Sequence, residues 1–338
     1  MALPLQSTGD PRSVRRVLRV FATFPLPAAA RNVLRGAALR SYRGPQPIPR
    51  RTLLSGVRGA DGLLCLLTDR VDGALLAGAP RLRAVANCAV GYDNVDLAAA
   101  GARGIVVTNT PDVLTESSAD LAFALILAAA RRVVEGDHMV RTGAWRGWRP
   151  DQLLGQDVHG ATLGVVGLGR IGAAVARRAR GFAMRVVYWS RRRSQRAPAG
   201  ARWVPLDRLL ATADVVTLHV PLTPATRGLI GARELARMKR TAVLVNTSRG
   251  PIVDERALIT ALRRRRIAAA GLDVFAAEPH VPAALRALPN VVLTPHVASA
   301  TTATRAAMAT LAARNLAVAL AGRRPPNRVE LTVRRARV

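Results

Sequence analysis

The chain has 338 residues, half of them hydrophobic, which is enough for two domains with cores of their own. With 51 Lys and Arg against 21 Asp and Glu, the formal net charge is +30, and Lys239 is the only lysine. The arginine runs at 191–193, 263–266 and 323–337 are not interleaved with aromatic residues, so a nucleic-acid surface is not expected. No stretch approaches the roughly 18 apolar residues of a membrane span. We expect a cytoplasmic protein whose charge favours anionic small molecules.

The two cysteines, Cys65 and Cys88, lie inside apolar segments and have neither metal-type nor redox-type spacing. We therefore expect no bound metal and no disulfide framework, with a reducing cytosol as the default environment. The first 16 residues are polar and show no period, which indicates a disordered lead or a wrongly assigned start.

From residue 17 onward, short apolar runs alternate with segments of helical period. The first part predicts a helix at 27–38 and strands at 17–23, 62–67, 84–88 and 105–108. A long helix is predicted at 115–132, because its apolar residues recur with helical period and its end is basic.

A second alternating series begins at residue 161. It predicts six strands, at 162–166, 185–189, 215–219, 242–246, 269–272 and 291–294. It also predicts intervening helices, at 171–181, 206–213, 232–238, 255–263 and 282–287. Strands that alternate with helices are typical of parallel α/β sheets.

A glycine-rich turn joins the first strand and first helix of this second series. Gly167, Gly169 and Gly172 have the Gly-x-Gly-x-x-Gly spacing of a dinucleotide-binding turn. The first glycine permits the tight turn, the second lets the backbone approach a pyrophosphate, and the third lets helix and strand pack closely. The helix N-terminus would supply free N–H groups for the phosphates.

Six strands after such a turn are what a complete dinucleotide-binding domain requires, whereas the final predicted helix, 302–320, has no strand to follow it. We predict two Rossmann-like or flavodoxin-like α/β domains with parallel sheets and an active site in the cleft between them. Residues 17–108 with 298–338 would form a discontinuous substrate domain, and residues 109–297 the dinucleotide-binding domain.

The strand after the glycine turn ends in Ser190, Arg191 and Arg192. An NAD site usually has an acidic residue here that binds the ribose 2′-OH, and this chain has none. A hydroxyl and two guanidinium groups suit a 2′-phosphate, so NADP(H) is favoured over NAD(H). A solvated basic loop in an arginine-rich protein is the alternative.

Three residues of the second series indicate the chemistry. Arg249 follows a buried strand directly and can bind a carboxylate in a two-pronged fashion. Glu278 and His296 follow the next two predicted strands and are 18 residues apart, so they can pair. Hydride addition to a ketone leaves an alkoxide, and a histidine with a carboxylate partner can supply its proton near neutral pH.

From residue 17 to residue 320 the chain resembles the D-isomer-specific 2-hydroxyacid dehydrogenase family, and within it the glyoxylate/hydroxypyruvate reductases. Besides the segments around Arg249, Glu278 and His296, the matching stretches are 62–69, 90–96, 110–115 and 143–148. A Val-Ala pair follows His296 where many relatives have Ile-Gly. This small departure leaves the expected acid role intact.

The resemblance implies roles for particular residues. Arg249 would hold the substrate carboxylate and carbonyl, His296 would be the acid/base, and Glu278 would tune it. The substrate-binding residues would be the N–H groups of Val90 and Gly91, with Leu67, Trp148 and Ser299. Trp148 would reach into the site of a partner subunit, because relatives are dimers built largely through the region 115–132.

The same resemblance assigns the remaining cofactor contacts. Thr115, Thr247 and Asp273 would contact the nicotinamide half, and Arg170 and Ile171 the pyrophosphate. His219, Pro221 and Thr226 complete the predicted cofactor residues.

The sequence thus predicts NADPH-dependent reduction of small 2-keto acids, glyoxylate to glycolate and hydroxypyruvate to D-glycerate. One alternative is a reductase for another D-2-hydroxy acid, such as a bulkier keto acid or 3-phosphoglycerate. A formate-oxidising relative is not expected, because that chemistry replaces the glutamate at Glu278. An alternative of another class is a non-enzymatic NAD(H)-sensing co-regulator, which the basic charge favours slightly.

Overall fold

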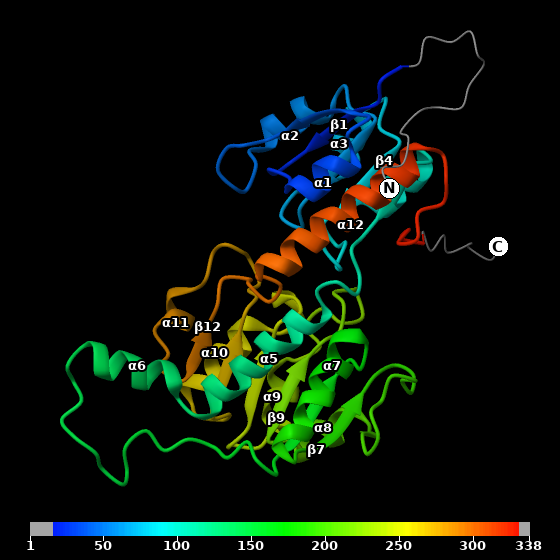
Figure 1. Ribbon diagram of the computed structural model, residues 1–338. Coiled ribbons are helices and arrows are strands. Elements are labelled where there is room, and N and C mark those ends of the chain that lie inside the picture. Colours follow the sequence, from blue (N-terminus) through cyan, green and yellow to red (C-terminus); the bar gives the residue numbers. More distant parts are fainter. Residues whose placement is uncertain (1–15, 331–338) are drawn as a thin grey trace. The chain divides into compact units, whose positions relative to one another are not determined.

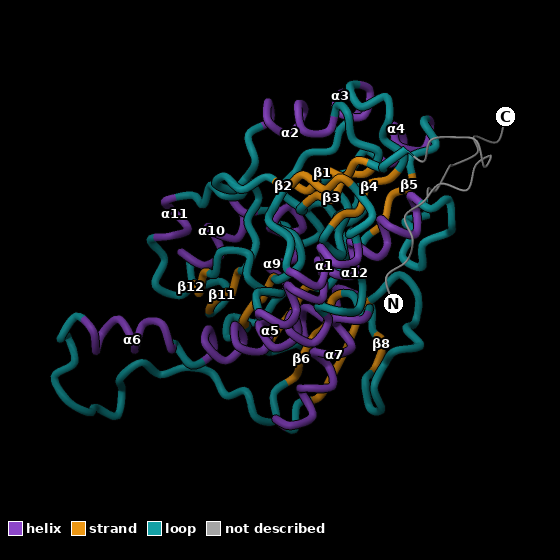
Figure 2. Tube along the Cα trace, turned by 45° about the horizontal axis from the view of Figure 1, so that its top comes forward, coloured by secondary structure: helices purple, strands orange, loops and turns teal. Residues whose placement is uncertain are grey.

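The computed structural model describes residues 16–330, so the predicted lead lies outside the described residues except for Arg16. The chain divides into two compact units. Of the described residues, 16–114 and 301–330 form one unit, and the other is Thr115–Ala300. Each unit is built around its own parallel β-sheet (Figures 1 and 2).

The discontinuous unit has a five-stranded sheet in the order β2-β1-β3-β4-β5. Its strands are β1 (Arg19–Ala22), β2 (Ala38–Ser41), β3 (Gly62–Cys65), β4 (Ala84–Asn87) and β5 (Val106–Thr108), and all neighbours are parallel. Its helices are α1 (Ala28–Val33), α2 (Arg50–Val57), α3 (Gly73–Ala77), α4 (Leu97–Ala102) and α12 (Thr302–Leu320). Helix α12 packs on α1 and on β3, β4 and β5, which is why the C-terminal segment belongs to this unit.

The other unit has a seven-stranded sheet in the order β12-β11-β10-β9-β6-β7-β8. Its strands are β6 (Thr162–Val166), β7 (Arg185–Trp189), β8 (Arg202–Trp203), β9 (Val215–Leu218), β10 (Val243–Asn246), β11 (Ala269–Leu272) and β12 (Val291–Leu293). Its helices are α5 (Thr115–Ala130), α6 (Val133–Arg141), α7 (Arg170–Ala179), α8 (Leu206–Thr212), α9 (Ala232–Arg237), α10 (Glu255–Arg263) and α11 (Ala283–Arg286), with short 3₁₀ turns at Arg180–Phe182 and Gly250–Ile252.

Both sheets change direction inside the strand order. In the larger sheet β6 lies between β7 and β9, so the chain builds one wing through β7 and β8 and the other through β9 to β12. In the smaller sheet β1 lies between β2 and β3. Open α/β sheets bind ligands at the carboxyl ends of the strands beside such a reversal, so the strand order places the glycine turn after β6 at the expected position.

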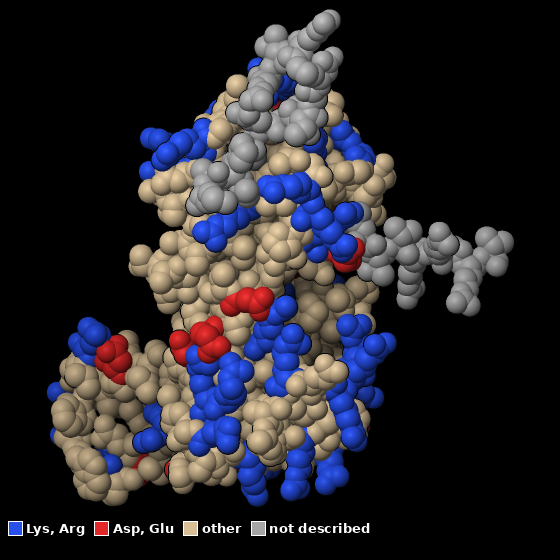
Figure 3. Space-filling model, turned by 45° about the vertical axis from the view of Figure 1, so that its right-hand side comes forward, with Lys and Arg blue, Asp and Glu red and all other residues tan. Residues whose placement is uncertain are grey.

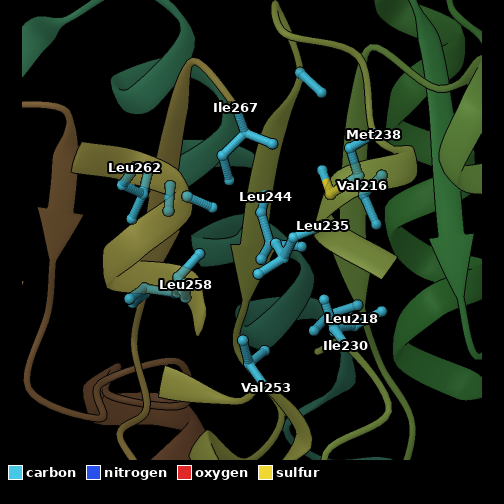
Figure 4. Packing of buried hydrophobic residues seen from close by; sticks show 14 of the residues in the cluster. Val216, Leu218, Ile230, Leu235, Met238, Leu244, Val253, Leu258, Leu262 and Ile267 are labelled. Carbon is cyan, nitrogen blue, oxygen red and sulfur yellow. The ribbon is translucent and has the colours of Figure 1, made fainter. Parts of the chain in front are cut away.

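The larger sheet has an apolar layer on each face. On one face, Leu235 of α9 and Leu258 and Leu262 of α10 pack against Leu244 of β10 (Figure 4). On the other face, α5 and α7 pack against the sheet, and Gly271 of β11 lets the backbone of α5 approach. Each fully buried leucine contributes about 1.5–3 kcal/mol of transfer free energy, so the strand ends rest on a rigid platform.

The predicted α/β class with two parallel sheets is confirmed, but several elements differ from the expectation. The helix predicted at 27–38 is wrong in its second half, because α1 ends at Val33 and β2 begins at Ala38. The larger sheet has a seventh strand, β8, which consists of two exposed residues. The short helices α2, α3, α4 and α6 were not predicted either.

Candidate active site

The glycine-rich turn lies between β6 and α7. Gly167 has a φ of 95°, and a Cβ there would lie 2.7 Å from the carbonyl carbon of His219. A Cβ on Gly172 would lie 2.2 Å from the carbonyl oxygen of Gly167, so neither position admits a side chain. Gly169 directly precedes α7, and a Cβ there would meet no atom within 4 Å. The turn therefore has open space beside the first N–H groups of α7, and it fits the pyrophosphate of a dinucleotide.

The loop after β7 carries the residues predicted to bind a 2′-phosphate. The indole N–H of Trp203 donates to the carbonyl of Ser190 (3.1 Å), and the guanidinium of Arg193 lies 5.9 Å from the centre of the Trp203 ring. The Ser190 hydroxyl donates to the carbonyl of Arg192 (2.5 Å), while Arg191 and Arg192 are exposed. No acidic residue occurs between β7 and α8. The loop is cationic and has no carboxylate that would repel a phosphate.

Arg249 lies in the loop after β10, and this loop is held from both sides. Asn246, the last residue of β10, is buried, and its Oδ1 accepts from the N–H of Ser248 (3.0 Å). Its Nδ2 donates to the carbonyl of Arg249 (3.0 Å). A Cβ on Gly250 would lie 1.9 Å from the carbonyl carbon of Phe275. Only glycine therefore lets the loop of Arg249 touch the loop after β11.

His296 and Glu278 form the pair that their spacing predicts. Nδ1 of His296 and Oε2 of Glu278 are 2.7 Å apart, and Oε1 of Glu278 accepts from the N–H of Phe275 (3.0 Å). Burial opposes ionisation of Glu278, but the hydrogen bond and charge of His296, with the Phe275 N–H and the charge of Arg249, lower its pKa. An ionised Glu278 accepts the proton of Nδ1. Nε2 of the ring is then the nitrogen that can exchange a proton with a substrate.

Asp273 holds the loop of His296. It is fully buried, and its Oδ1 accepts from the hydroxyl of Thr294 (2.6 Å) and the N–H of Val297 (2.8 Å). Oδ2 accepts from the N–H of Ala298 (2.8 Å), and the backbone carbonyl accepts from the N–H of His296 (2.9 Å). His296 has a φ of 54°, a left-handed conformation that costs a non-glycine residue about 1–2 kcal/mol. These bonds offset that cost and fix the ring.

The other predicted cofactor residues of this unit follow β9 and β10 or begin helices. The hydroxyl of Thr247 is buried and has no hydrogen-bond partner within residues 16–330, so it can bind a ligand amide. Burial lowers the pKa of His219 to about 4, and its Nε2 lies 2.9 Å from the hydroxyl of Thr217. The hydroxyl of Thr226 donates to the carbonyl of Pro221 (2.6 Å) and shapes their loop. Three further residues begin helices: Thr115 in α5, and Arg170 and Ile171 in α7.

The predicted substrate-binding residues lie in several places. Leu67 follows β3, and Val90 and Gly91 follow β4, so all three lie at the carboxyl edge of the five-stranded sheet. Ser299 is half-buried, three residues beyond His296. Trp148 lies in the segment after α6 and is 82% exposed, so within its unit it does not pack against Arg249, Glu278 or His296.

The structure therefore gathers Arg249, Glu278 and His296 at one edge of the larger sheet, the edge that also carries the glycine turn. Sequence reasoning missed Asn246 and Gly250, and it gave Asp273 no part in holding His296. An asparagine at the end of a buried strand is a signal for a turn that its side chain closes, and a glycine after a functional arginine is a signal for close backbone approach. Neither signal says which loop lies opposite.

The charge of the molecule is visible on its surface. On the face shown in Figure 3, Lys and Arg side chains spread over both units and acidic side chains are few. No helix within residues 16–330 is long and apolar enough to cross a membrane. The same residues contain no group of three or more His, Cys, Asp or Glu that could hold a metal ion.

Comparison with known proteins gives a consistent result. Residues 123–298 match the family model described as D-isomer specific 2-hydroxyacid dehydrogenase, NAD binding domain. A glyoxylate reductase of Korarchaeum cryptofilum is 50% identical over 324 residues, which cover 94% of this chain and 98% of that protein.

Solved structures agree with this match. A protein of Thermus thermophilus is 49% identical with a TM-score of 0.87, over 93% of this chain and 100% of that one. An NADPH-dependent glyoxylate/hydroxypyruvate reductase from Sinorhizobium meliloti, in complex with NADP and malonate, is 36% identical with a TM-score of 0.82. That likeness covers 94% of this chain and 98% of the other.

Proposed function

Because the chain belongs to the D-isomer-specific 2-hydroxyacid dehydrogenase family and is an NAD(P)-dependent oxidoreductase, we propose that it reduces glyoxylate to glycolate and hydroxypyruvate to D-glycerate with NADPH. The observation that carries the proposal is the 2.7 Å pair of His296 and Glu278, with the charge of Arg249 acting on Glu278, at the sheet edge of the glycine turn. The names of the glyoxylate reductases that it resembles support the substrate class.

The residues divide the reaction between them. NADPH, when bound, supplies the hydride that adds to the carbonyl carbon. Arg249 binds the substrate carboxylate and draws the carbonyl oxygen into place, since a guanidinium matches two oxygens at once. Nε2 of His296 donates its proton to that oxygen, and Glu278 keeps the ring oriented by accepting the proton of Nδ1. Asp273 holds the loop on which the ring is mounted.

We propose that the two units bind different molecules, because their loops carry different predicted binding residues. The unit that carries the glycine turn would bind the cofactor. The discontinuous unit would bind the substrate through Leu67 and the N–H groups of Val90 and Gly91, as the resemblance implies.

We propose NADPH over NADH because of the loop after β7. Ser190, Arg191 and Arg192 offer a hydroxyl and two cations where an NAD site has a carboxylate. An NADPH-dependent relative supports this proposal.

We also propose a homodimer that forms through α6 and the segment after it, rather than largely through the expected region 115–132, because much of α5 is already buried in its own unit. Six of the nine exposed large hydrophobic side chains within residues 16–330 lie between 133 and 154, namely Val133, Val134, Val140, Trp145, Trp148 and Leu154. Helix α6 has no buried residue and extends away from the sheet of its own unit (Figures 1 and 2). An exposed apolar patch of this kind is typical of a protein–protein interface. Trp148 would then act at the site of the partner.

The test is the loss of absorbance at 340 nm with purified protein, glyoxylate or hydroxypyruvate, and NADPH or NADH in parallel. We expect fast oxidation that prefers NADPH, and a preference that disappears when Arg191 and Arg192 are both replaced by Ala. His296→Ala should lower kcat by roughly 10²–10⁴, the usual contribution of a general acid. Turnover with NADH alone would refute the role of the arginine loop. Cofactor binding without turnover of either acid would point to another keto acid or to a sensor.

A further inference from the structure

The loop after β4 has three consecutive carbonyl groups that all accept hydrogen bonds. The carbonyl of Ala89 accepts from the N–H of Thr110 (2.9 Å). The carbonyl of Val90 accepts from Nδ2 of Asn109 (2.8 Å), and the carbonyl of Gly91 accepts from Nδ2 of Asn87 (2.7 Å). In three successive peptide groups the carbonyl oxygen is therefore held by a hydrogen bond.

The opposite ends of these peptide groups are N–H donors. The peptide bonds of this loop are trans, so the carbonyl and the N–H of each group point in opposite directions. The N–H groups of Val90, Gly91 and Tyr92 therefore point away from the donors that hold their carbonyls. None of these N–H groups donates to an acceptor within residues 16–330. Three unpaired backbone donors in a row can bind an anion.

The two asparagines are themselves fixed. Asn87 is fully buried, and its Oδ1 accepts from Nδ2 of Asn94 (3.3 Å), so its amide can face Gly91 only with the nitrogen. Nδ2 of Asn94 also donates to the carbonyls of Leu66 (3.1 Å) and Asp69 (3.0 Å). Asn94 therefore connects the loop of Leu67 to the loop of Val90 and Gly91.

Asn109 is held through its backbone. Its N–H donates to the carbonyl of Asn327 (3.2 Å), and its carbonyl accepts from Nδ2 of Asn315 in α12 (3.0 Å). Its side chain thus approaches the carbonyl of Val90 from a rigid position at the end of β5.

We propose that Asn87 and Asn109 are positioning residues of a cradle for the substrate carboxylate. They orient the peptide groups so that the N–H groups of Gly91 and Tyr92 join that of Val90 as donors. Asn94 acts on the cradle indirectly, because its amide holds the side chain of Asn87. The proposal deepens and rests on the proposed function, since it takes the anion at this loop to be the carboxylate of a 2-keto acid. It adds Tyr92 N–H to the donors and assigns the asparagines a role in substrate affinity.

A purely structural role for these asparagines makes a different prediction. Asparagines that only stabilise the loop would change the unfolding temperature and leave the affinity for the anion unchanged. A role in the cradle changes the affinity for carboxylates and leaves cofactor affinity unchanged. Asn290 provides a matched control, because it is also buried and donates Nδ2 to two backbone carbonyls, those of Leu262 (3.4 Å) and Ala268 (2.9 Å).

The experiment compares the full-length wild type with Asn87→Ala, Asn109→Ala, Asn94→Ala and Asn290→Ala. The readouts are the KM for glyoxylate, the Kd of oxalate at saturating NADPH by calorimetry, the Kd of NADPH, and the unfolding temperature. We expect the KM for glyoxylate and the Kd of oxalate to rise about tenfold or more in Asn87→Ala and Asn109→Ala, because charged hydrogen bonds are the strong ones. The rise should be smaller in Asn94→Ala. The Kd of NADPH should stay within about twofold in all of them, and Asn290→Ala should change neither anion value.

The outcomes separate the two proposals. Unchanged oxalate and glyoxylate affinity in folded Asn87→Ala and Asn109→Ala would overturn the cradle. If either variant fails to fold, Asn94→Ala decides, and its unchanged oxalate affinity would overturn it equally. If the wild type does not reduce glyoxylate but binds oxalate in an asparagine-dependent way, the proposed substrate is wrong and the anion cradle stands.

Discussion

At the scale of single residues, the geometry of the pair of His296 and Glu278 fixes the charge of the glutamate. Both oxygens of Glu278 are hydrogen-bonded, and its pKa is lowered from the ordinary value of 4.5. The carboxylate is therefore ionised throughout the neutral range. It lies 2.7 Å from Nδ1 of His296, so it accepts the proton of Nδ1 and orients the ring.

Glu278→Gln removes this charge and keeps the shape of the side chain. We expect kcat for glyoxylate reduction to fall roughly tenfold or more, because an amide oxygen accepts the proton of Nδ1 more weakly than a carboxylate does and orients the ring less firmly. An unchanged kcat in Glu278→Gln would refute the role of the glutamate.

Glu278→Gln should also change how the free energy of unfolding depends on pH. Folding lowers the pKa of Glu278, so its stabilising contribution is present above pH 4.5 and is lost as the pH falls through the lowered value. Unfolding of Glu278→Gln, monitored by circular dichroism, should therefore show a smaller loss of stability in acid than that of the wild type.

The sequence predicts the candidate catalytic residues but not the residues that hold their loops in place. Arg249, Glu278 and His296 follow three successive strands of a parallel sheet, β10, β11 and β12, and the carboxyl ends of such strands meet at one edge. The residues that hold them could not be found in this way. Asn246 and Asp273 act through the backbone of particular turns, and those turns exist only once the loops have folded against each other.

At the scale of elements, the contact between the loops after β10 and β11 places Arg249 beside Glu278. A Cβ at Gly250 would lie 1.9 Å from the backbone of Phe275, and backbone atoms cannot be displaced as a flexible side chain can. Gly250→Ala should therefore move the loop of Arg249 and lower kcat/KM at least about a hundredfold, with a loss of roughly 1–3 kcal/mol in stability.

Gly181→Ala is the matched control for this substitution. A Cβ there would meet no atom within 4 Å, and the residue lies in a helical turn after α7. The activity of Gly181→Ala in the glyoxylate assay should equal that of the wild type, and its stability should be equal or higher. Normal activity in Gly250→Ala would show that the two loops need not touch.

The elements that the sequence predicted well are those with continuous apolar runs. Strands β6, β10 and β11 are buried at every position, so their composition marks them clearly. Strands β2 and β8 lie at sheet edges and have exposed or half-buried residues, so they carry no such signal. Helix α6 buries nothing within its own chain, and the partner that would explain its apolar residues is not part of the sequence pattern.

The proposed dimer gives a direct test of α6. Val134 and Val140 are 49% and 61% exposed, and a charge placed at each would be buried unpaired at a two-fold interface and repeated by symmetry. We expect the double variant Val134→Glu, Val140→Glu to elute as a monomer of about 36 kDa by light scattering, against twice that mass for the wild type. Val17→Glu, at a position 59% exposed in the other unit, should remain a dimer. A dimeric double variant would exclude this interface.

At the scale of the whole molecule, the net charge of +30 acts on every anion that approaches. Glyoxylate, hydroxypyruvate and NADPH are all negatively charged, and a positive protein raises their local concentration and their rate of encounter. The effect depends on charges beyond the binding residues, because arginines are spread over both units (Figure 3). Salt screens such long-range attraction, with a Debye length of about 10 Å at 0.1 M and about 3 Å at 1 M.

Raising the ionic strength from about 0.02 M to 0.5 M should therefore lower kcat/KM for glyoxylate roughly tenfold, mainly through a higher KM, while kcat changes little. Sodium chloride and sodium sulfate at equal ionic strength distinguish screening from competition. Screening depends on ionic strength alone, whereas an anion that competes for Arg249 or for the N–H groups of Val90 and Gly91 acts according to its identity. Equal effects of the two salts would assign the rate to the field of the whole protein. No effect of either salt would confine the attraction to the site itself, and the arginines outside it would then play no part in catalysis.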